Sequence, residues 1–283
     1  MKHLVVTADD FGAAREVNDA VEQAHKNGIL SAASLMVSGE AATDAVRRAK
    51  SMPNLRVGLH LVLVDGQPLL PPDQVPDLVD AAGNFRNAMA RAGAAMFFFP
   101  NVRRQLEAEM QAQFRAFAAT GLALDHVNAH KHFHLHPTIA GLMVKFARAF
   151  GAKGARVPLE PQDVLVQIAD HKVSGTVALT TPFARALRRR FEREGIAAPD
   201  QVFGLAWSGA MRADRLEGLL AHLPEGLSEI YMHPATGSYP GSAPGYEYAA
   251  ELAALTDPRM AGLLKAQDIR LGGFGDFGDF LVQ

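Results

Sequence analysis

The chain has 283 residues, of which 48% are hydrophobic and 20% charged, a composition typical of ordinary globular proteins. Its formal net charge of −2 gives no electrostatic reason to expect nucleic acid as a partner. The absence of cysteine excludes disulfides and thiolate metal ligands, so a bound metal would need nitrogen and oxygen ligands.

The first residues lack the pattern of a secretory signal. Apolar residues 4–6 are followed closely by Asp9 and Asp10, which leaves no hydrophobic stretch of signal-peptide length. No run of the chain approaches the roughly 20 apolar residues needed to cross a bilayer. We therefore expect a cytoplasmic protein.

Segments with the composition of strands alternate with segments of helical spacing. Apolar and β-branched runs predict strands over residues 3–8, 29–37, 56–63, 122–127, 154–158, 201–206, 228–232 and 269–271. Apolar residues at helical spacing predict helices over 17–24, 40–51, 102–119, 142–149, 175–194 and 212–222. Such alternation is typical of parallel strands joined by crossover helices. We predict one α/β domain over residues 1–283, a β/α barrel of seven or eight parallel strands.

Residues 65–100 interrupt this alternation after the third predicted strand. The segment is irregular and rich in proline, and it ends in the apolar run 96–99. An insertion of this length is often a functional loop or lid. We expect the apolar run to pack within a helix or lid; the alternative is an apolar rim for a lipid-like substrate.

Polar residues that suit catalysis or metal binding lie in or directly after several predicted strands. Five of the eleven histidines fall within residues 126–136, after the fourth strand. In a β/α barrel the carboxyl ends of the strands share one rim, so residues distant in sequence meet there. The candidates, in chain order, are Asp9 and Asp10 (first strand), His60 (third), His130, His132 and His134 (after the fourth), Arg156 (fifth) and His233 (seventh).

One aspartate with two histidines forms a set that holds a divalent metal and leaves positions open for water and substrate. A metal in such a site acidifies bound water and polarises a carbonyl. Asp9 and Asp10 would point to opposite faces of a regular strand, so their spacing does not decide which binds metal and which acts as general base. His233 could protonate a leaving group, and Arg156 could orient the base.

Each candidate also has a purely structural interpretation. His60 taken alone is typical of a hydrogen-bonded core histidine, His233 of loop structure and Arg156 of an ion-pair partner. The histidine cluster could be a solvated polar loop. The other histidines are predicted to serve surface, packing or helix-start roles: His3, His25, His136, His171 and His222.

Three motifs, in this order, resemble the YdjC-like carbohydrate deacetylases: Thr-Ala-Asp-Asp-Phe-Gly at 7–12, Gly-Leu-His at 58–60 and His-x-His-x-His at 130–134. The resemblance covers most of the chain. It implies a β/α barrel similar to the polysaccharide deacetylases, which remove N-acetyl groups with a divalent metal.

By this resemblance, one divalent ion, zinc or magnesium, would be held by Asp10, His60 and His130, and Asp9 would be the catalytic base. His233 matches a late catalytic or substrate-contacting histidine, and Arg156 matches an arginine that supports the base. His132 and His134 would contact substrate or support the site.

Residues 128–134 and the tail 271–277 are more similar to a subgroup associated with hopanoid biosynthesis, whose members are thought to deacetylate an N-acetylglucosaminyl hopanoid. Family members often carry Asp-Ser before the first histidine of the run and another histidine after it. Here Asn128-Ala129 and Lys131 stand at those positions, a departure that bears on sugar contacts more than on the metal.

The resulting hypothesis is a metal-dependent hydrolase that removes an N-acetyl group from an N-acetylglucosamine-bearing glycolipid and releases acetate. The alternatives are a deacetylase of soluble chito-oligosaccharides and a non-catalytic sugar- or lipid-binding barrel. A lipid-linked substrate would bring transient contact with the inner-membrane surface. Homo-oligomerisation is left open.

Overall fold

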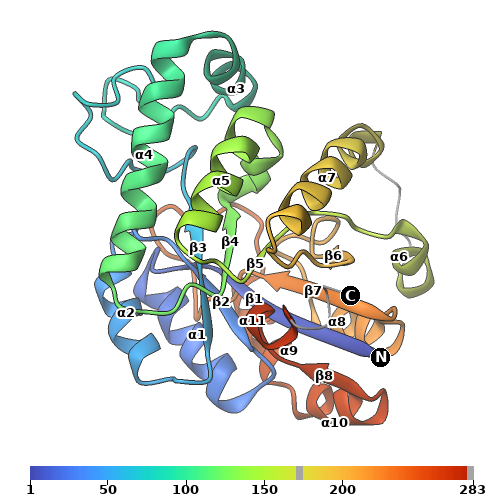
Figure 1. Cartoon of the computed structure of the whole chain (residues 1–283). Coiled ribbons are helices and arrows are strands. Elements are labelled where there is room, and N and C mark those ends of the chain that lie inside the picture. The colour runs from blue at the N-terminus through green and yellow to red at the C-terminus, as the bar shows by residue number, and fades with distance from the viewer. Residues whose placement is uncertain (170–174, 279–283) are drawn as a thin grey trace.

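The computed structural model describes residues 1–169 and 175–278, so His171 lies outside the described residues. All pairings between its named strands are parallel (Figure 1). The strands are β1 (Lys2–Phe11), β2 (Ala32–Leu35), β3 (Arg56–Leu61), β4 (His126–Ala129), β5 (Gly154–Ala155), β6 (Gln201–Phe203), β7 (Gly226–Met232) and β8 (Ile269–Leu271). They form one sheet in the order β5-β4-β3-β2-β1-β7-β6, with β8 paired to the start of β1.

The sheet curls into a barrel whose seam lies between β5 and β6. A bridge between Gly154 and Ala197, just before β6, joins the two ends, and the Ala155 N–H donates to the Ala197 carbonyl at 2.8 Å. The predicted barrel of seven or eight parallel strands is confirmed. Its regularity is broken at β8, which pairs only with residues 2–4 of β1 among the described strands.

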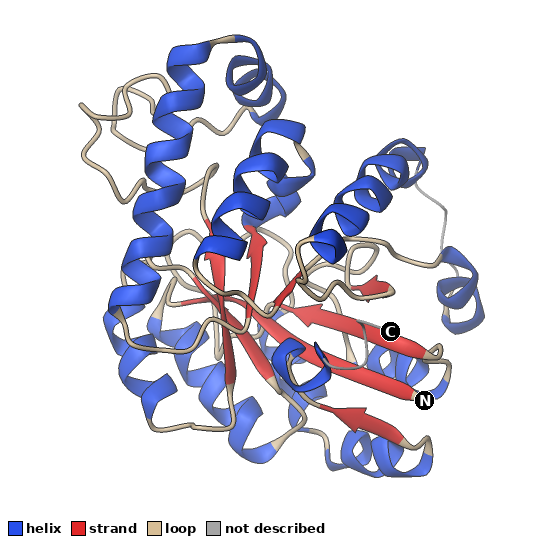
Figure 2. Ribbon diagram, viewed as in Figure 1, coloured by secondary structure: helices blue, strands red, loops and turns tan. Residues whose placement is uncertain are grey.

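Helices surround the strands (Figure 2). They are α1 (Arg15–Asn27), α2 (Ala42–Lys50), α3 (Met89–Phe98), α4 (Pro100–Ala119), α5 (Pro137–Ala149), α6 (Gln162–Ile168), α7 (Gly175–Arg193), α8 (Ala213–Ala221), α9 (Tyr248–Thr256), α10 (Pro258–Ala266) and α11 (Phe274–Phe277), with the 3₁₀ segment η1 (His130–Leu135). In the described ranges, no helix combines the length and apolarity that a membrane crossing requires.

Alternate side chains of β1 enter two different environments, as the pleat of a strand requires. Leu4, Val6 and Ala8 belong to the large core that also contains the helices. Val5 lies in a separate apolar cluster with Phe274 and Phe277 of α11. Thus α11, which the sequence did not predict, packs against the barrel at the amino ends of the strands.

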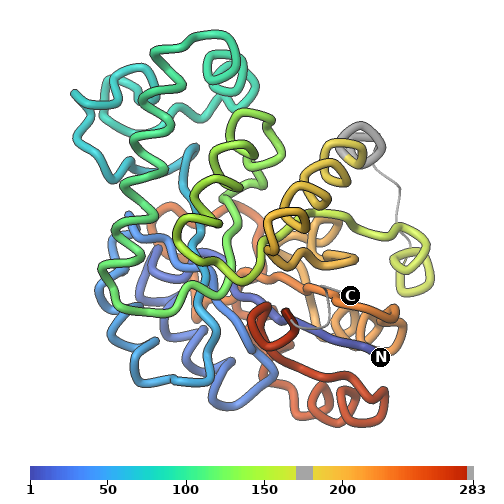
Figure 3. The backbone as a smooth tube through the Cα atoms, viewed as in Figure 1, coloured from blue at the N-terminus to red at the C-terminus, as the bar shows by residue number. Residues whose placement is uncertain are grey.

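The insertion after β3 is more ordered than predicted. Its second half is α3, which lies beside the start of α4 and projects away from the barrel (Figure 3). Met96 is buried, but Phe97, Phe98 and Phe99 are 45%, 68% and 57% exposed. The run thus lies on a helix, as one part of the expectation had it, but of its four residues only Met96 is packed inside, and the three phenylalanines at the end of α3 are exposed.

Replacing Phe274 by alanine should lower the free energy of unfolding by about 3–5 kcal/mol, because it empties a fully buried ring position. The control is Phe98→Ala, which removes an exposed ring and should change stability by no more than about 0.5 kcal/mol. Urea denaturation followed by circular dichroism measures both. Equal stability of the two variants would contradict the packing role of α11.

Candidate metal centre and active site

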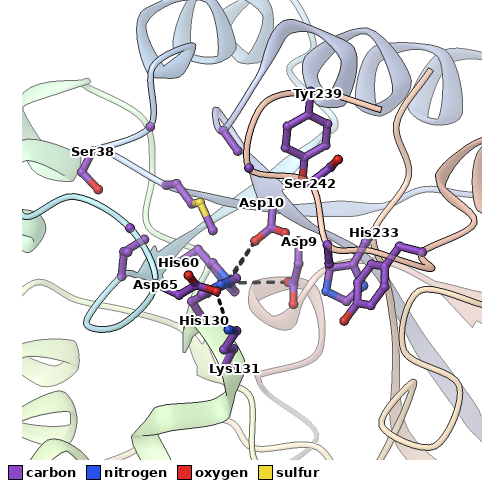
Figure 4. Close-up of a pocket in the computed structure, with 18 of the residues that line it drawn as sticks. Asp9, Asp10, Ser38, His60, Asp65, His130, Lys131, His233, Tyr239 and Ser242 are labelled. Atoms are coloured by element: carbon purple, nitrogen blue, oxygen red, sulfur yellow. Dashed lines mark hydrogen bonds and ion pairs between the residues drawn. The ribbon is translucent and has the colours of Figure 1, made fainter. Parts of the chain in front are cut away.

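Asp10, His60 and His130 meet at the carboxyl ends of β1, β3 and β4 (Figure 4). The Asp10 Oδ1 atom lies 3.3 Å from His60 Nε2 and 3.4 Å from His130 Nδ1. The potential ligand atoms of the three residues all lie within 4.8 Å of one another. This is the arrangement expected of three ligands around one ion.

Two of these atoms are buried without a hydrogen-bond partner among the described residues: Asp10 Oδ1 and His60 Nε2. An unsatisfied buried polar atom is costly unless a ligand or ion satisfies it. The other ring nitrogen of His60, Nδ1, is engaged by Asn128 Oδ1 at 2.7 Å, which leaves Nε2 as the free ligand atom. The residues present therefore fit a divalent cation with nitrogen and oxygen ligands.

The backbone at Asp10 explains how two neighbouring aspartates face one site. Asp10 has a φ of 61°, in the left-handed region that non-glycine residues seldom occupy. The pairing of β1 with β2 is irregular at this point, between Ala8 and Phe11. The strand alternation is thereby broken, so Asp10 joins the two histidines while Asp9 still points into the barrel.

Asp9 is held by a buried arginine. Arg156 donates to both carboxylate oxygens of Asp9, at 2.5 and 3.0 Å, and to both oxygens of Glu229, at 2.8 and 3.0 Å. Burial favours the neutral form of Asp9, but the charge and hydrogen bonds of Arg156 outweigh it and hold the pKa of that carboxyl well below its ordinary range. Asp9 is therefore a carboxylate at neutral pH.

The remaining predicted histidines divide into two groups. His132 and His233 line the cavity above the metal centre, and His132 Nε2 lies 2.9 Å from the Tyr231 hydroxyl. His134 is fully buried and lies within 3.1 Å of the Arg156 carbonyl, so its position suits support of the site and not substrate contact. The sequence predicted Arg156 within the fifth strand, but β5 ends at Ala155 and Arg156 directly follows it.

The cavity has a volume of about 890 Å³ and contains Asp9, Asp10, His60 and His130 in its wall. All four tyrosines of the chain also line it: Tyr231, Tyr239, Tyr246 and Tyr248. The insertion contributes further residues, and its Asp65 forms an ion pair with Lys131 at the edge of the cavity. No role was predicted for these tyrosines or for Glu229, although the tyrosine-rich composition of residues 239–248 was a signal that could have been used.

Comparisons of this chain with known proteins indicate one family. The profile of the family described as YdjC-like protein matches residues 3–266. A carbohydrate deacetylase of Geobacillus stearothermophilus is 30% identical over 281 residues, which cover 98% of each chain. A chitooligosaccharide deacetylase of Yersinia pestis is 28% identical, over 97% of this chain and 99% of that one. A crystal structure from Enterococcus faecalis shares the fold, with a TM-score of 0.76, 24% identity and 98% coverage of each chain.

His134 should make stability depend on pH. Burial, and then the charge of Arg156, lowers the pKa of His134 to about 3, whereas an unfolded histidine titrates near 6.5. The stabilisation is complete above about pH 6.5. Below pH 6.5, His134 binds a proton in the unfolded chain but not in the folded one, so the free energy of unfolding falls by about 1.4 kcal/mol per pH unit.

The test compares the free energies of unfolding of wild type and His134→Gln between pH 7 and pH 4. Glutamine can still donate to the Arg156 carbonyl but does not titrate. The difference between the two proteins should change by about 1.4 kcal/mol per pH unit below pH 6.5. The exposed His222→Gln is the control and should follow the wild type. Parallel curves for wild type and His134→Gln would contradict the prediction.

Proposed function

The chain belongs to the YdjC-like family, and we propose that it is a metal-dependent deacetylase. Its reaction would be hydrolysis of the N-acetyl group of an N-acetylglucosamine-bearing substrate to a free amine and acetate. The observation that carries this proposal is the set Asp10, His60 and His130 beside the ionised Asp9, all in one cavity wall. The names of the relatives, carbohydrate deacetylase and chitooligosaccharide deacetylase, support the same chemistry.

Asp10, His60 and His130 would hold the ion, and either zinc or magnesium suits their nitrogen and oxygen atoms. When bound, a divalent ion in such a site polarises the acetamide carbonyl and acidifies a water molecule. The protein supplies the geometry, because the three side chains come from different strand ends that the barrel fixes relative to one another.

Asp9 would be the general base. Its carboxylate lies in the cavity wall, and the two bonds from Arg156 fix the plane of the carboxylate. Glu229 shares the same guanidinium, so the positive charge of Arg156 is divided between two carboxylates. Asp9 can therefore accept a proton from water without the arginine leaving its place.

His233 would be the general acid for the departing amine. Its side chain lines the cavity between Tyr231 and Tyr246, at ring-centroid distances of 5.7 and 5.1 Å. Its Nδ1 atom is buried and has no hydrogen-bond partner among the described residues, so the other ring nitrogen, Nε2, would be the atom that gives the proton to the amine. Its backbone N–H donates to the buried carboxylate of Glu251, which fixes the strand end.

The shape of the cavity suits a sugar. Aromatic rings stack on the apolar faces of sugar rings. Tyr231 and Tyr246 of the wall flank the proposed acid His233, and Tyr248 packs between Tyr246 and Tyr239. Lys131 and His132 of η1 also line the cavity and would contribute polar contacts. A soluble chito-oligosaccharide satisfies these features.

The exposed tip of the insertion favours a second candidate substrate, a lipid-linked N-acetylglucosamine such as a hopanoid glycolipid. Phe97, Phe98 and Phe99 are exposed there, and residues 81–104 contain four arginines and no acidic residue. Arg91 and Phe98 are seven positions apart on α3 and so share a helix face. A cationic, aromatic tip suits peripheral contact with an anionic membrane such as the bacterial inner membrane.

Acetate release should occur from diacetylchitobiose or from an N-acetylglucosaminyl lipid, and a chelator should abolish it. His130→Ala should lose both stoichiometric metal and activity. Asp9→Asn should keep the metal but lose roughly 100- to 10,000-fold in kcat, because it lacks the base. Enzymatic assay of acetate and metal analysis of the purified variants measure these outcomes.

Full activity of metal-free protein would refute the metal-dependent mechanism. Release of acetate from the soluble sugar alone would refute the lipid substrate. Sugar binding without release from either substrate, unchanged in Asp9→Asn, would support the non-catalytic binding barrel instead.

The protein should bind phosphatidylglycerol vesicles, and the triple variant Phe97→Ser, Phe98→Ser, Phe99→Ser should bind them roughly tenfold more weakly or worse. The control is Phe183→Ser, which alters an equally exposed phenylalanine on α7. Co-sedimentation measures binding. Self-association that depends on the three phenylalanines, without vesicle binding, would assign the tip to a homo-oligomer interface instead.

A further inference from the structure

Asn128 contacts both the proposed ligand His60 and the proposed base Asp9. Its Oδ1 atom lies 2.7 Å from His60 Nδ1, and its Nδ2 atom donates to Asp9 Oδ1 at 3.3 Å. The Asp9 carboxylate can only accept, so the amino group of Asn128 must face it and the carbonyl must face His60. His60 therefore carries a proton on Nδ1, which leaves Nε2, 3.3 Å from Asp10 Oδ1, as its ligand atom for the proposed ion.

A second set of contacts, through Ser34, also holds Asn128. Its Nδ2 also donates to Ser34 Oγ at 2.8 Å, and Ser34 Oγ lies 3.0 Å from His126 Nε2. The Nδ1 atom of His126 lies 3.0 Å from Asp125 Oδ2, which can only accept. His126 is thus protonated on Nδ1, and its Nε2 accepts the hydroxyl proton of Ser34.

The chain of hydrogen bonds continues into α11. The backbone N–H groups of Phe274 and Gly275 donate to Asp125, at 3.2 and 2.9 Å. Gly58 of β3 leaves the room that His126 needs, because a Cβ atom at this position would lie 2.4 Å from its ring. The Gly-Leu-His motif and the glycine-rich tail are separate in the sequence, but both contact the same buried pair, His126 and Asp125.

These polar side chains are buried, three of them completely: Ser34, His126 and Asn128. A buried chain of polar groups is stable only when every donor and acceptor is matched. Because the carboxylates of Asp9 and Asp125 at its two ends can only accept, the donor and acceptor of each hydrogen bond between them are determined. We propose that Asn128 is a positioning residue for both His60 and Asp9, and that Ser34, His126 and Asp125 hold it in that orientation. The inference rests on the proposed metal-dependent function and adds its supporting residues.

An amide is suited to this position. It accepts from His60 and donates to Asp9 at the same time, which a carboxylate could do only after taking up a proton. A carboxylate at position 128 would also place a second negative charge against Asp9. Asn128 therefore keeps the ligand and the base oriented without adding charge.

The test is Ser34→Ala, which cuts the chain without touching either His60 or Asp9. The matched control is Ser31→Ala, which removes a buried hydroxyl that bonds only the backbone of Val6 among the described residues. Zinc affinity, measured by chelator competition, should fall roughly tenfold in Ser34→Ala and roughly 10- to 100-fold in Asn128→Ala. Ser31→Ala should bind zinc like the wild type.

Nitrogen NMR of the metal-free protein gives a second readout. At a pH high enough for His60 to be neutral, the wild type should show its proton on Nδ1 alone, and Ser34→Ala should show a mixture of tautomers. If Ser34→Ala does not fold, Asp125→Asn, which places an amide against His126, should give the same changes from the far end of the chain. Wild-type zinc affinity and an unchanged His60 tautomer in the folded variant would overturn the inference. A wild type that binds no zinc would refute the proposed function, while the tautomer comparison would still test the chain.

Discussion

The interaction on which the rest of the site depends is the buried contact of Arg156 with Asp9 and Glu229. Desolvating three charges is costly, and removing Arg156 would leave two buried carboxylates without a counter-charge. The three residues come from strand ends or strands far apart in the sequence, so the barrel must close in one register to satisfy them. Closure of the fold and the pairing of Asp9 with Arg156 are thus one event.

The polar interior follows from the two-residue period of the strands. Along β1, side chains that face the helices are apolar, while Val5, Thr7 and Asp9 face inward and grow more polar toward the carboxyl end. The inward residues of β7 follow the same trend from Leu227 to Glu229. The barrel is therefore sealed by apolar packing at one end and becomes a hydrogen-bonded site at the other.

Local patterns were sufficient to predict the strands and the rim on which the candidate residues meet, because alternation and strand ends are local properties. They could not separate the roles of Asp9 and Asp10, since the left-handed backbone at Asp10 is set by tertiary context. Local patterns also could not pair Arg156 with Glu229, because a single glutamate in a predicted strand is typical of a surface charge. The direction in which Phe98 points was equally hidden, because it depends on how α3 docks against its neighbours.

The placement of β1 between β2 and β7 has a consequence for biosynthesis. β1 is made first, yet its partner strand begins 224 residues later, at the pairing of Lys2 with Gly226. Contacts so distant in sequence form late and slow folding. A nascent chain that ends just before residue 226 contains Asp9, His60, His130 and Arg156 but lacks β7, and with it the second carboxylate that Arg156 binds, Glu229. Nearly the whole chain must therefore be made before β1, which carries the proposed metal ligand Asp10, is flanked by both of its neighbouring strands, and shorter fragments should not be expected to retain the site.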